Sequence, residues 1–409
     1  MIDLLNVDSL EETIQKLYNE CVNNGFDIDI EEIDVKDSLN RVLAEDVLAS
    51  VDVPNFDRSV VDGYAVIAKD TEAATDTIPA FLNVVGESFM GQSCDIEINN
   101  GECVYVPTGA MLPKGATACV MVEYTENITD KKIAVYSSVA DGKNVIKKGD
   151  DIAKGTVLLT KGKRLTPADI GYLSCMVGKI KVYRELNITI ISTGDELIDY
   201  KDELTLGKIR NTNTNAIINL SRKYGLNVLN NYVLKDDEKL LEDTIKSAIQ
   251  NSDVVVVSGG SSKGKKDASS IVIDRLTSSK VLTHGIAIKP GKPTITSYDN
   301  KTKTIVVGLP GHPTAAYILF QLVVVEVINR LMNVKNHDLV CEGTITENLP
   351  ASPGRKTIQL VNIDEKFNVT PIYGRSGLTR ILSMADGYII IDTNQEGINK
   401  GDRVKVYYL

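Results

Sequence analysis

The sequence predicts a multidomain α/β protein with a central doubly wound parallel sheet domain, an inserted small β domain and a C-terminal β domain. Three observations support this fold class. The 409 residues exceed the ~100–200 residues of a typical single domain. Strand-like and helix-like segments alternate between Leu186 and about Asn333, which favours a parallel sheet with helices on both faces. Short β-like runs punctuated by glycine and proline lie on either side of this region and predict the two β domains.

The same patterns predict four domains. Residues 1–50 and 141–182 form an N-terminal linker and helical domain, residues 51–140 the inserted β domain, residues 183–333 the α/β domain, and residues 334–409 the C-terminal β domain. Trp is absent and Phe is scarce, so Val, Ile and Leu must fill the cores. Aliphatic cores of this kind suit buried parallel sheets.

Local sequence patterns predict the individual helices and strands. Ser9 and Glu12 have the spacing of a capping box, and apolar residues recur every three or four positions until Gly25 ends the first helix. Thr166 and Pro167 predict an N-cap and a first-turn proline at the start of another helix. The strands and helices expected in the α/β region cover residues 188–191, 215–224, 228–234, 238–249, 254–257, 268–276, 281–288, 304–307 and 313–332.

Composition and charge exclude several classes of function. The formal net charge of −10 repels phosphate backbones and no long basic stretch offsets it, so nucleic acid is not an expected partner. The six cysteines are dispersed without a CxxC pair, which argues against a structural zinc site and a disulfide framework. The acidic N-terminus has no apolar signal core, and Gln321 and Glu326 interrupt the apolar stretch 313–332. We therefore expect a cytoplasmic protein with no membrane partner.

Ligands of parallel α/β sheets bind beyond the carboxyl ends of the strands. In residues 253–267, an apolar strand runs into a Gly/Ser loop that opens a helix. The amides at a helix N-terminus attract anions, and Lys263, Lys265 and Lys266 add positive charge. The segment is either a solvated basic turn or a phosphate site, and the preceding buried strand favours the phosphate site.

This loop also resembles a P-loop. Gly259, Gly264 and Lys265 satisfy most of that pattern, but Lys266 stands where the hydroxyl that binds magnesium belongs. A P-loop ATPase or GTPase is therefore the weaker alternative. Asp267, just inside the helix, suits either a cation that bridges to a phosphate or a favourable first-turn acid.

Two further loops follow predicted strands. Lys289 and Lys292 stand three residues apart on a backbone stiffened by two prolines, which suits an oxyanion. A surface turn shaped by proline is the equal alternative. The loop 308–313 leads from a strand into a helix and is either a tight connector or a third part of the same site.

Acidic residues follow the same geometry. Glu196 and Asp236 come after successive predicted strands, where carboxylates can reach a ligand. Asp237 is better explained as the cap of the helix that begins near residue 238. In the inserted domain, Asp62 precedes Gly63 in a sequence that is also a plain turn signal. Composition alone does not separate these interpretations.

The motifs become distinctive when they are taken together and in order. They are DVPNFDRS (52–59), VDGYA (61–65), VPTGA (106–110), GDDI (149–152), STGDEL (192–197), SGG-x-S-x-G-x-x-D (258–267), KPGKP (289–293), LPG (309–311), GRSGL (374–378) and ADGY (385–388). In this combination the chain resembles the molybdopterin molybdenumtransferase family, the molybdenum insertases, which includes the C-terminal domain of gephyrin. The resemblance extends from the first helix to the last strand.

The resemblance implies an enzyme, a molybdopterin molybdotransferase, in the last step of molybdenum cofactor biosynthesis. Its substrates would be molybdate and adenylylated molybdopterin, and Mg²⁺ would assist the release of AMP. It also implies an elongated homodimer in which the α/β domain of one subunit faces the inserted β domain of the other. A transient contact with the molybdopterin adenylyltransferase is a further implied partner.

By motif position, the resemblance assigns three groups of site residues. The functional acidic and hydroxyl positions match Asp62, Thr108, Glu196, Asp236 and Asp267. Of these, the carboxylates suited to a hydrated magnesium ion are Glu196, Asp236 and Asp267. The loop that binds the pterin phosphate matches Ser258, Gly259, Gly260, Ser262 and Gly264. The positions associated with molybdate match Lys289, Lys292, Arg355 and Ser376.

Two departures from the family pattern leave alternatives open. The family usually has L-P-G-N-P-x-S where this chain has His312 for Asn and Ala315 for Ser, which removes a hydroxyl near the expected oxyanion site. A non-catalytic molybdopterin-binding or scaffold module and a tungstate-specific paralogue are therefore alternatives. The related adenylyltransferase shares the α/β domain, but the two β domains argue against it. The four retained carboxylates favour catalysis.

Overall fold

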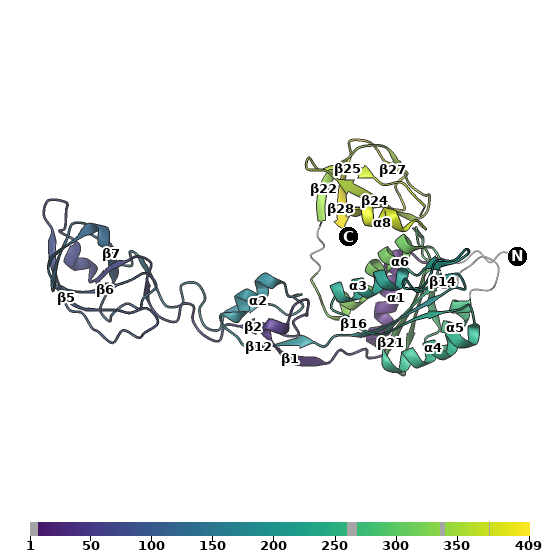
Figure 1. Ribbon diagram of the computed structural model, residues 1–409, viewed down its shortest axis with the longest axis horizontal. Helices are drawn as coiled ribbons and strands as arrows, with labels where there is room; N and C mark the ends of the chain where they lie inside the picture. Colours follow the sequence, from purple (N-terminus) through teal and green to yellow (C-terminus); the bar gives the residue numbers. More distant parts are fainter. Residues whose placement is uncertain (1–6, 260–267, 336–339, 376) are drawn as a thin grey trace.

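The computed structural model describes residues 7–259, 268–335, 340–375 and 377–409. The molecule is elongated (Figure 1). The β-rich segment around residues 60–135 forms one end, and the α/β region from about residue 186 to residue 331 forms the other. The C-terminal β segment lies beside the α/β region, and a narrow middle section joins the two ends.

A six-stranded sheet forms the centre of the α/β region. Its spatial order is β16 (Asn227–Leu234), β13 (Asn187–Thr193), β17 (Val254–Gly259), β21 (Thr304–Leu309), β20 (Ile295–Asp299) and β18 (Val281–His284). The first four strands pair in parallel, as predicted.

The prediction of a wholly parallel sheet is wrong at one edge. Strand β20 pairs antiparallel with both β21 and β18. Only residues 300–303 separate β20 from β21, and so short a connection makes a hairpin, because a parallel pair needs a crossover of about a dozen residues. The sheet is therefore mixed, whereas the α/β fold class itself is confirmed.

Helices cover both faces of this sheet. One face is covered by α1 (Leu10–Asn23), α3 (Asn213–Lys223) and the long helical segment before residue 332, the other by α4 (Glu238–Asn251) and α5 (Ala268–Leu276). In β17, Val254 and Val256 belong to the first core and Val255 and Val257 to the second, and all four are fully buried. Each buried valine contributes about 1.5–3 kcal/mol to stability. Because β17 has valines on both faces, helices on both faces are needed to bury them.

The long apolar segment consists of α6 (Pro313–Leu319), a π-helical stretch η4 (Phe320–Val325) and α7 (Glu326–Leu331). Among the described residues it is the one helix long and apolar enough to cross a membrane, but 67% of its most apolar window is buried inside the protein. It packs against α1, α3 and β21. Its apolar composition is therefore that of a core helix, as the sequence predicts.

The first helix begins with the predicted capping box. The Glu12 amide donates to Ser9 Oγ (3.1 Å), and the Ser9 amide donates to Glu12 Oε2 (2.8 Å). Thr166 and Asp169 form a second capping box at the start of α2 (Pro167–Ser174), with proline in the first turn. Both helix starts are therefore confirmed.

The middle section of the molecule is built from short antiparallel pairs around a small core of its own. Its elements are β1 (Ile30–Asp34), which pairs with β12 (Lys179–Tyr183), β2 (Val47–Leu48), which pairs with β11 (Val157–Leu159), the 3₁₀ turn η1 (Val35–Asp37) and α2. Segments from before and after the β-rich end thus meet here, so that end is an insertion into this section.

The inserted segment folds into a second six-stranded sheet. The order is β7 (Ala118–Met121), β4 (Gly63–Val66), β6 (Glu102–Val106), β5 (Ala80–Glu87), β9 (Lys132–Val135) and β8 (Thr125–Thr129). Short elements complete it: β3 (Arg58–Ser59), which pairs with β10 (Val145–Ile146), and the 3₁₀ turns η2 (Ala68–Thr71) and η3 (Val122–Tyr124). Both faces of β4 are buried.

The C-terminal segment forms a third six-stranded sheet that closes on itself. Its order is β19 (Ile288–Lys289), β24 (Lys356–Ile363), β25 (Asn368–Pro371), β22 (Val340–Ile345), β28 (Arg403–Tyr408) and β26 (Gly387–Ile391), with β24 also paired to β26. The remaining elements are α8 (Thr379–Met384), which packs on α6, and the pair β23 (Leu349–Pro350) and β27 (Gly397–Ile398). Strand β19 comes from the α/β region and fixes this barrel to it.

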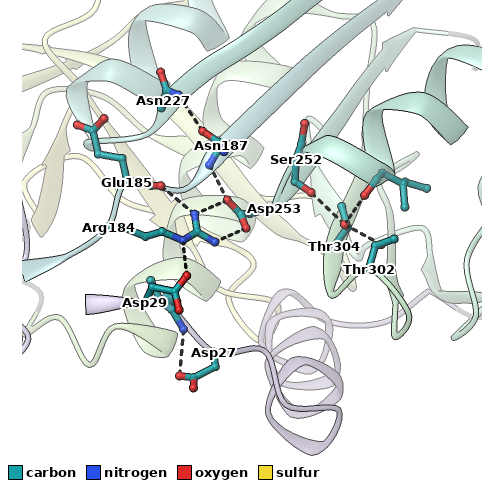
Figure 2. A network of polar contacts seen from close by, with 12 residues as sticks. Asp27, Asp29, Arg184, Glu185, Asn187, Asn227, Ser252, Asp253, Thr302 and Thr304 are labelled. Atoms are coloured by element: carbon teal, nitrogen blue, oxygen red, sulfur yellow. Dashed lines mark hydrogen bonds and ion pairs between the residues drawn. The ribbon is translucent and has the colours of Figure 1, made fainter. Parts of the chain in front are cut away.

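A polar network fastens the middle section to the central sheet (Figure 2). Arg184 lies between β12 and β13, and its guanidinium donates two hydrogen bonds to the carboxylate of Asp253, at 2.8 and 2.7 Å. The same carboxylate accepts the amide of Asn187 (2.7 Å). The connection between the two parts of the molecule is therefore held by a bidentate ion pair.

Candidate active site

The carboxyl ends of three strands meet at one edge of the central sheet. Thr193, at the end of β13, pairs with Gly259 at the end of β17. Ser258 pairs in turn with Leu309 at the end of β21. Because these strands are parallel, the loops that follow them leave from the same edge. The prediction of a shared edge is confirmed for the loops after β13, β17 and β21. It is wrong for the loop at residues 289–293, because that loop follows β19, which pairs with β24 in the C-terminal sheet.

The start of α3 contacts the first of these strand ends through a buried chain of hydrogen bonds. Asn211 Nδ2 donates to Thr214 Oγ1 (2.8 Å), and the Thr214 hydroxyl is hydrogen-bonded to Ser192 Oγ at 2.7 Å. The Asn211 carboxamide oxygen also accepts the Thr214 amide (3.2 Å). Asn211 therefore both caps α3 and anchors it to β13.

Asn213 contacts the other two strand ends. Its Nδ2 donates to Ser258 Oγ on β17 (2.9 Å) and to the carbonyl of Gly311 after β21 (2.9 Å). Sequence reasoning missed this residue. The available signal was the run of Thr and Asn at residues 211–215, residue types that favour helix starts, before the apolar face of the next helix.

The candidate phosphate loop begins at Gly259. This glycine has φ of +109°, and a Cβ placed on it would lie 2.3 Å from the carbonyl oxygen of Thr193. Only glycine fits both the backbone conformation and the close approach. The other loop residues predicted from the sequence, Gly260, Ser262 and Gly264, lie outside the described residues.

Two of the predicted carboxylates follow neighbouring parallel strands. Glu196 comes after β13 and Asp236 after β16, and both side chains are exposed. The two loops are tied together, because the Asp236 amide donates to Asp195 Oδ1 (3.1 Å) and the Gly194 amide donates to the carbonyl of Leu234 (3.1 Å). Glu196 and Asp236 therefore lie in adjoining loops at one corner of the site.

At this corner, two of the three carboxylates predicted to bind a metal ion, Glu196 and Asp236, lie within the described residues. Asp237 is committed to α4, where it accepts the amide of Leu240 (2.9 Å) as the helix cap, as predicted. In the described part of the chain, no group of three or more His, Cys, Asp and Glu side chains is placed to hold a metal ion. Asp267, the third predicted carboxylate, lies outside that part. Two carboxylates with substrate phosphates are a common way to bind Mg²⁺.

Several cationic residues lie in the segments where the α/β region joins the C-terminal barrel. Strand β19 runs parallel to β24, with Lys289 opposite Thr357 and Ile288 opposite Lys356. Arg355, which is exposed, immediately precedes β24 and lies two residues before Thr357, the partner of Lys289. Lys292 is half-buried in the turn that follows. Ser376, predicted for the same group, lies outside the described residues.

His312 lies at the interface between α6 and the C-terminal segment. It is the N-cap residue of α6, and its imidazole lies about 4 Å from the position that a Cβ on Gly377 would occupy. It therefore faces Gly377 in the C-terminal segment. Ala315, in the first turn of α6, is buried, so this position adjoins the packed core and not an open surface.

Asp62 and Thr108 form a separate pair in the inserted segment. Asp62 Oδ1 accepts the amide of Thr108 at 2.7 Å, and both residues are exposed. They adjoin β4 and β6, at the opposite end of the molecule from β16 and β21 (Figure 1). Within one chain, the structure does not bring this pair to the other candidate residues.

Two cavities in the described structure lie away from these residues. One, of about 610 Å³, is lined by charged residues of the barrel that include Lys356, Asp392 and Arg403. The other, of about 370 Å³, lies between α4, α5 and the end of β20. Neither cavity is lined by a candidate residue, so the site is defined by its loops and their hydrogen bonds.

Comparison with known proteins places the whole chain in one family. The model of the MoeA N-terminal region (domain I and II) matches residues 8–176, that described as "Probable molybdopterin binding domain" residues 189–330, and that of the MoeA C-terminal region (domain IV) residues 342–409. A molybdopterin molybdenumtransferase of Bacillus subtilis is 33% identical over 386 residues, which are 91% of this chain and 88% of that protein. One of Haemophilus influenzae is 29% identical over 389 residues, which are 93% and 94% of the two chains.

A solved structure agrees with this assignment. The crystal structure of a molybdopterin biosynthesis MoeA protein from Pyrococcus horikosii matches with a TM-score of 0.83 and 34% identity, and the match covers 98% of this chain and 99% of that chain. The structural match and the sequence matches both extend over more than nine tenths of this chain. The chain therefore belongs to the MoeA family, the molybdopterin molybdenumtransferases of molybdenum cofactor biosynthesis.

Proposed function

We propose that the protein inserts molybdate into adenylylated molybdopterin and releases AMP in a magnesium-dependent reaction. The observation that carries this proposal is the pairing of β19 with β24, which places Lys289 opposite Thr357, two residues after Arg355. A doubly charged oxyanion is well matched by an ammonium and a guanidinium that approach from two elements. In this proposal Lys289, Lys292, Arg355 and Ser376 bind molybdate.

The pterin nucleotide would occupy the edge of the central sheet. The backbone amides after Ser258 and Gly259 would bind its phosphate, since amides at the opening of a helix suit an anion. Gly260, Ser262 and Gly264 complete this loop in the proposal. The close approach of Gly259 to Thr193 leaves no room for a larger residue, which supports a loop whose backbone contacts a ligand directly.

The oxygen donors of the corner fit a hard divalent ion. Glu196 and Asp236 would hold Mg²⁺ together with substrate phosphate oxygens, and Asp267 would complete the set. When bound, the ion would neutralise charge on the phosphate as AMP leaves. The carboxylates themselves would orient the ion and its water shell, and Lys289 and Arg355 would hold molybdate on the other side.

The position of Asp62 and Thr108 supports a homodimer. The two residues lie at the far end of their own chain (Figure 1), so they can complete the site only of a second copy. We propose that the inserted domain, residues 51–140, faces the α/β domain, residues 183–333, of the partner subunit, with 1–50 and 141–182 as the spacer and 334–409 as the C-terminal domain. A cytoplasmic location and a transient contact with the adenylyltransferase that supplies the substrate belong to the same proposal.

The test is release of AMP from adenylylated molybdopterin with Mg²⁺ and either molybdate or tungstate. Oxyanion-dependent release supports the proposed reaction, and the ratio of the two rates reports the preferred metal. A protein that binds the pterin nucleotide without releasing AMP would be a binding or scaffold module. Faster turnover with tungstate would identify a tungstate-specific paralogue.

A further inference from the structure

We propose that Asn213 is a positioning residue, whose carboxamide clamps the start of the phosphate loop to the loop that opens α6. The inference rests on the proposed function, because it assigns Asn213 to the alignment of the two substrates. No motif that supported the family resemblance includes this residue. It is identified by its contacts in the folded chain.

One amide group holds two loops that are far apart in sequence. Asn213 Nδ2 donates to Ser258 Oγ, 45 residues away, and to the carbonyl of Gly311, 98 residues away, both at 2.9 Å. The Ser258 hydroxyl in turn lies 3.5 Å from the carbonyl oxygen of Pro310. Both protons of the amide are therefore used, and α3, the end of β17 and the backbone at residues 310–311 are each linked to the other two.

The cap of α3 does not account for this side chain. The N-cap position is Thr212, and no side chain there bonds to the helix. The capping bond comes from Asn211, whose Oδ1 accepts the Thr214 amide. Asn213 instead points its carboxamide away from its own helix, so its sequence position at the helix start is incidental to its contacts.

The clamp is maintained at a cost to the folded state. Asn213 is 8% exposed, and its Oδ1 is buried with no hydrogen-bond partner among the described residues. Thr193 Oγ1 on β13 and Thr314 Oγ1 on α6 are also buried and unpartnered within that part of the chain. A buried acceptor without a donor is unfavourable, and such violations gather where function, not stability, has selected the residue.

The two clamped loops lead to different parts of the proposed site. Ser258 leads into the phosphate loop, and Gly311 leads to His312, which faces the C-terminal segment close to Gly377. A fixed spacing between these loops sets the distance from the phosphate to the oxyanion. Loss of the clamp should therefore misalign the reacting groups while each substrate keeps most of its own contacts.

The test compares Asn213→Ala and Asn213→Asp with Asn227→Ala. Asp has the size of Asn but places a carboxylate oxygen against the Gly311 carbonyl, so it should fail as Ala does. Asn227 donates to Asn187 Oδ1 (2.8 Å) at the opposite end of the same sheet (Figure 2), and it is a matched control. We expect kcat for AMP release to fall about 10- to 100-fold in both Asn213 variants, with less than about a threefold change in either KM.

Amide hydrogen exchange provides a readout that needs no substrate. In the Asn213 variants, exchange should rise at Gly259, Gly311 and His312 and stay unchanged in the β20–β21 hairpin. Wild-type kcat together with wild-type exchange in both variants would overturn the proposal, and so would a general rise in exchange across the sheet. If the wild-type protein releases no AMP, the proposed function fails, and the exchange pattern alone then decides whether the clamp exists.

Discussion

The guanidinium of Arg184 and the carboxylate of Asp253 form a bidentate pair at the point where the middle section enters the central sheet (Figure 2). The hydrogen bonds that Arg184 donates to Asp253 raise the pKa of the guanidinium above its ordinary value, so Arg184 stays charged throughout the physiological range. Their side chains are 29% and 18% exposed, which protects the contact from full solvent screening. The pair therefore links the connection between β12 and β13 to the residue before β17.

Replacement of Arg184 should weaken this junction. Arg184→Ala removes the two hydrogen bonds to Asp253 together with those to Asp29 and to the carbonyl of Glu185, and it should lower the free energy of unfolding by about 1–3 kcal/mol. The control is Arg403→Ala, because the pair of Arg403 with Glu342 joins side chains that are 66% and 70% exposed, and such pairs contribute about 0–1 kcal/mol. Urea unfolding midpoints measure both effects. Equal midpoints for the two variants would show that the partly buried pair contributes no more than an exposed one.

The carboxylate of Asp62 should be required for turnover. Asp62→Ala should abolish AMP release without unfolding the protein, because Asp62 is exposed and, among the described residues, its side chain accepts a hydrogen bond only from the amide of Thr108. Asp70→Ala is a matched control, since Asp70 also accepts a backbone amide, that of Gly101, at 2.7 Å in the same domain. Turnover and circular dichroism measure the two properties. An active Asp62→Ala protein would remove Asp62 from the proposed site.

A composite site across two subunits should allow complementation. A chain with Asp62→Ala and a chain with Lys289→Ala each lack one part of the site, so each homodimer should be inactive. In a random mixture, half of the dimers are mixed and each mixed dimer has one intact site, which gives about a quarter of the wild-type turnover. Co-expression of the two chains and measurement of AMP release test this. Recovery of no activity, with mixed dimers present, would place Asp62 and Lys289 in the same site of one chain or in no site at all.

Sequence patterns predicted the elements whose local signals agree with their packing. The capping boxes of Ser9 and Thr166 and the apolar run of β17 have clear periodicity, and they form as expected. Strand β20 was missed because its residues, Ile295–Asp299, mix polar and apolar side chains although all are buried. Buried Thr296 and Ser297 look like surface residues in the sequence, and only their neighbours in space make them part of the core.

Some features of the candidate site could likewise be predicted from the sequence, and others could not. Loops such as the one at Gly259 follow strands and contain recognisable residue types, so their edge of the sheet could be predicted. The contacts of Asn213 could not, because they depend on two loops that lie 45 and 98 residues away. The distance between Asp62 and the rest of the site also follows from the length of the middle section, which local pattern does not reveal.

The lysines of the β19 turn should affect molybdate more than the pterin nucleotide. Lys289→Ala and Lys292→Ala each remove a cationic donor, and the loss of about 1.5–3 kcal/mol per charged hydrogen bond corresponds to a rise in the KM for molybdate of about 10- to 100-fold. The KM for adenylylated molybdopterin should change little. Lys301→Ala, an exposed lysine after β20 at the opposite edge of the sheet, is the control. A parallel rise in both KM values would show that these lysines bind the nucleotide.

The loss of folding stability at acidic pH should depend on Asp299. Burial by itself would raise the pKa of this carboxyl, but hydrogen bonds from Thr302 and Ser278 hold its pKa below the ordinary value of 3.8. These bonds include the Thr302 hydroxyl at 2.8 Å and the Ser278 amide at 3.1 Å. Because the folded-state pKa is depressed, the stabilisation is fully present above pH 3.8 and is lost as the pH falls through the folded-state pKa.

Asp299→Asn should therefore be destabilising at neutral pH, by about 1–3 kcal/mol, and the difference from the wild type should shrink towards zero in acid. Asp364→Asn is the comparison, since Asp364 accepts similar bonds from Lys366 and Asn368 at 2.8–2.9 Å but is exposed. Solvent screens its charge, so its variant should show a weaker dependence on pH. Urea unfolding at several pH values between about 6 and 3 measures the difference for both variants. A difference for Asp299→Asn that stays constant over this range would mean that the carboxylate charge contributes nothing to folding.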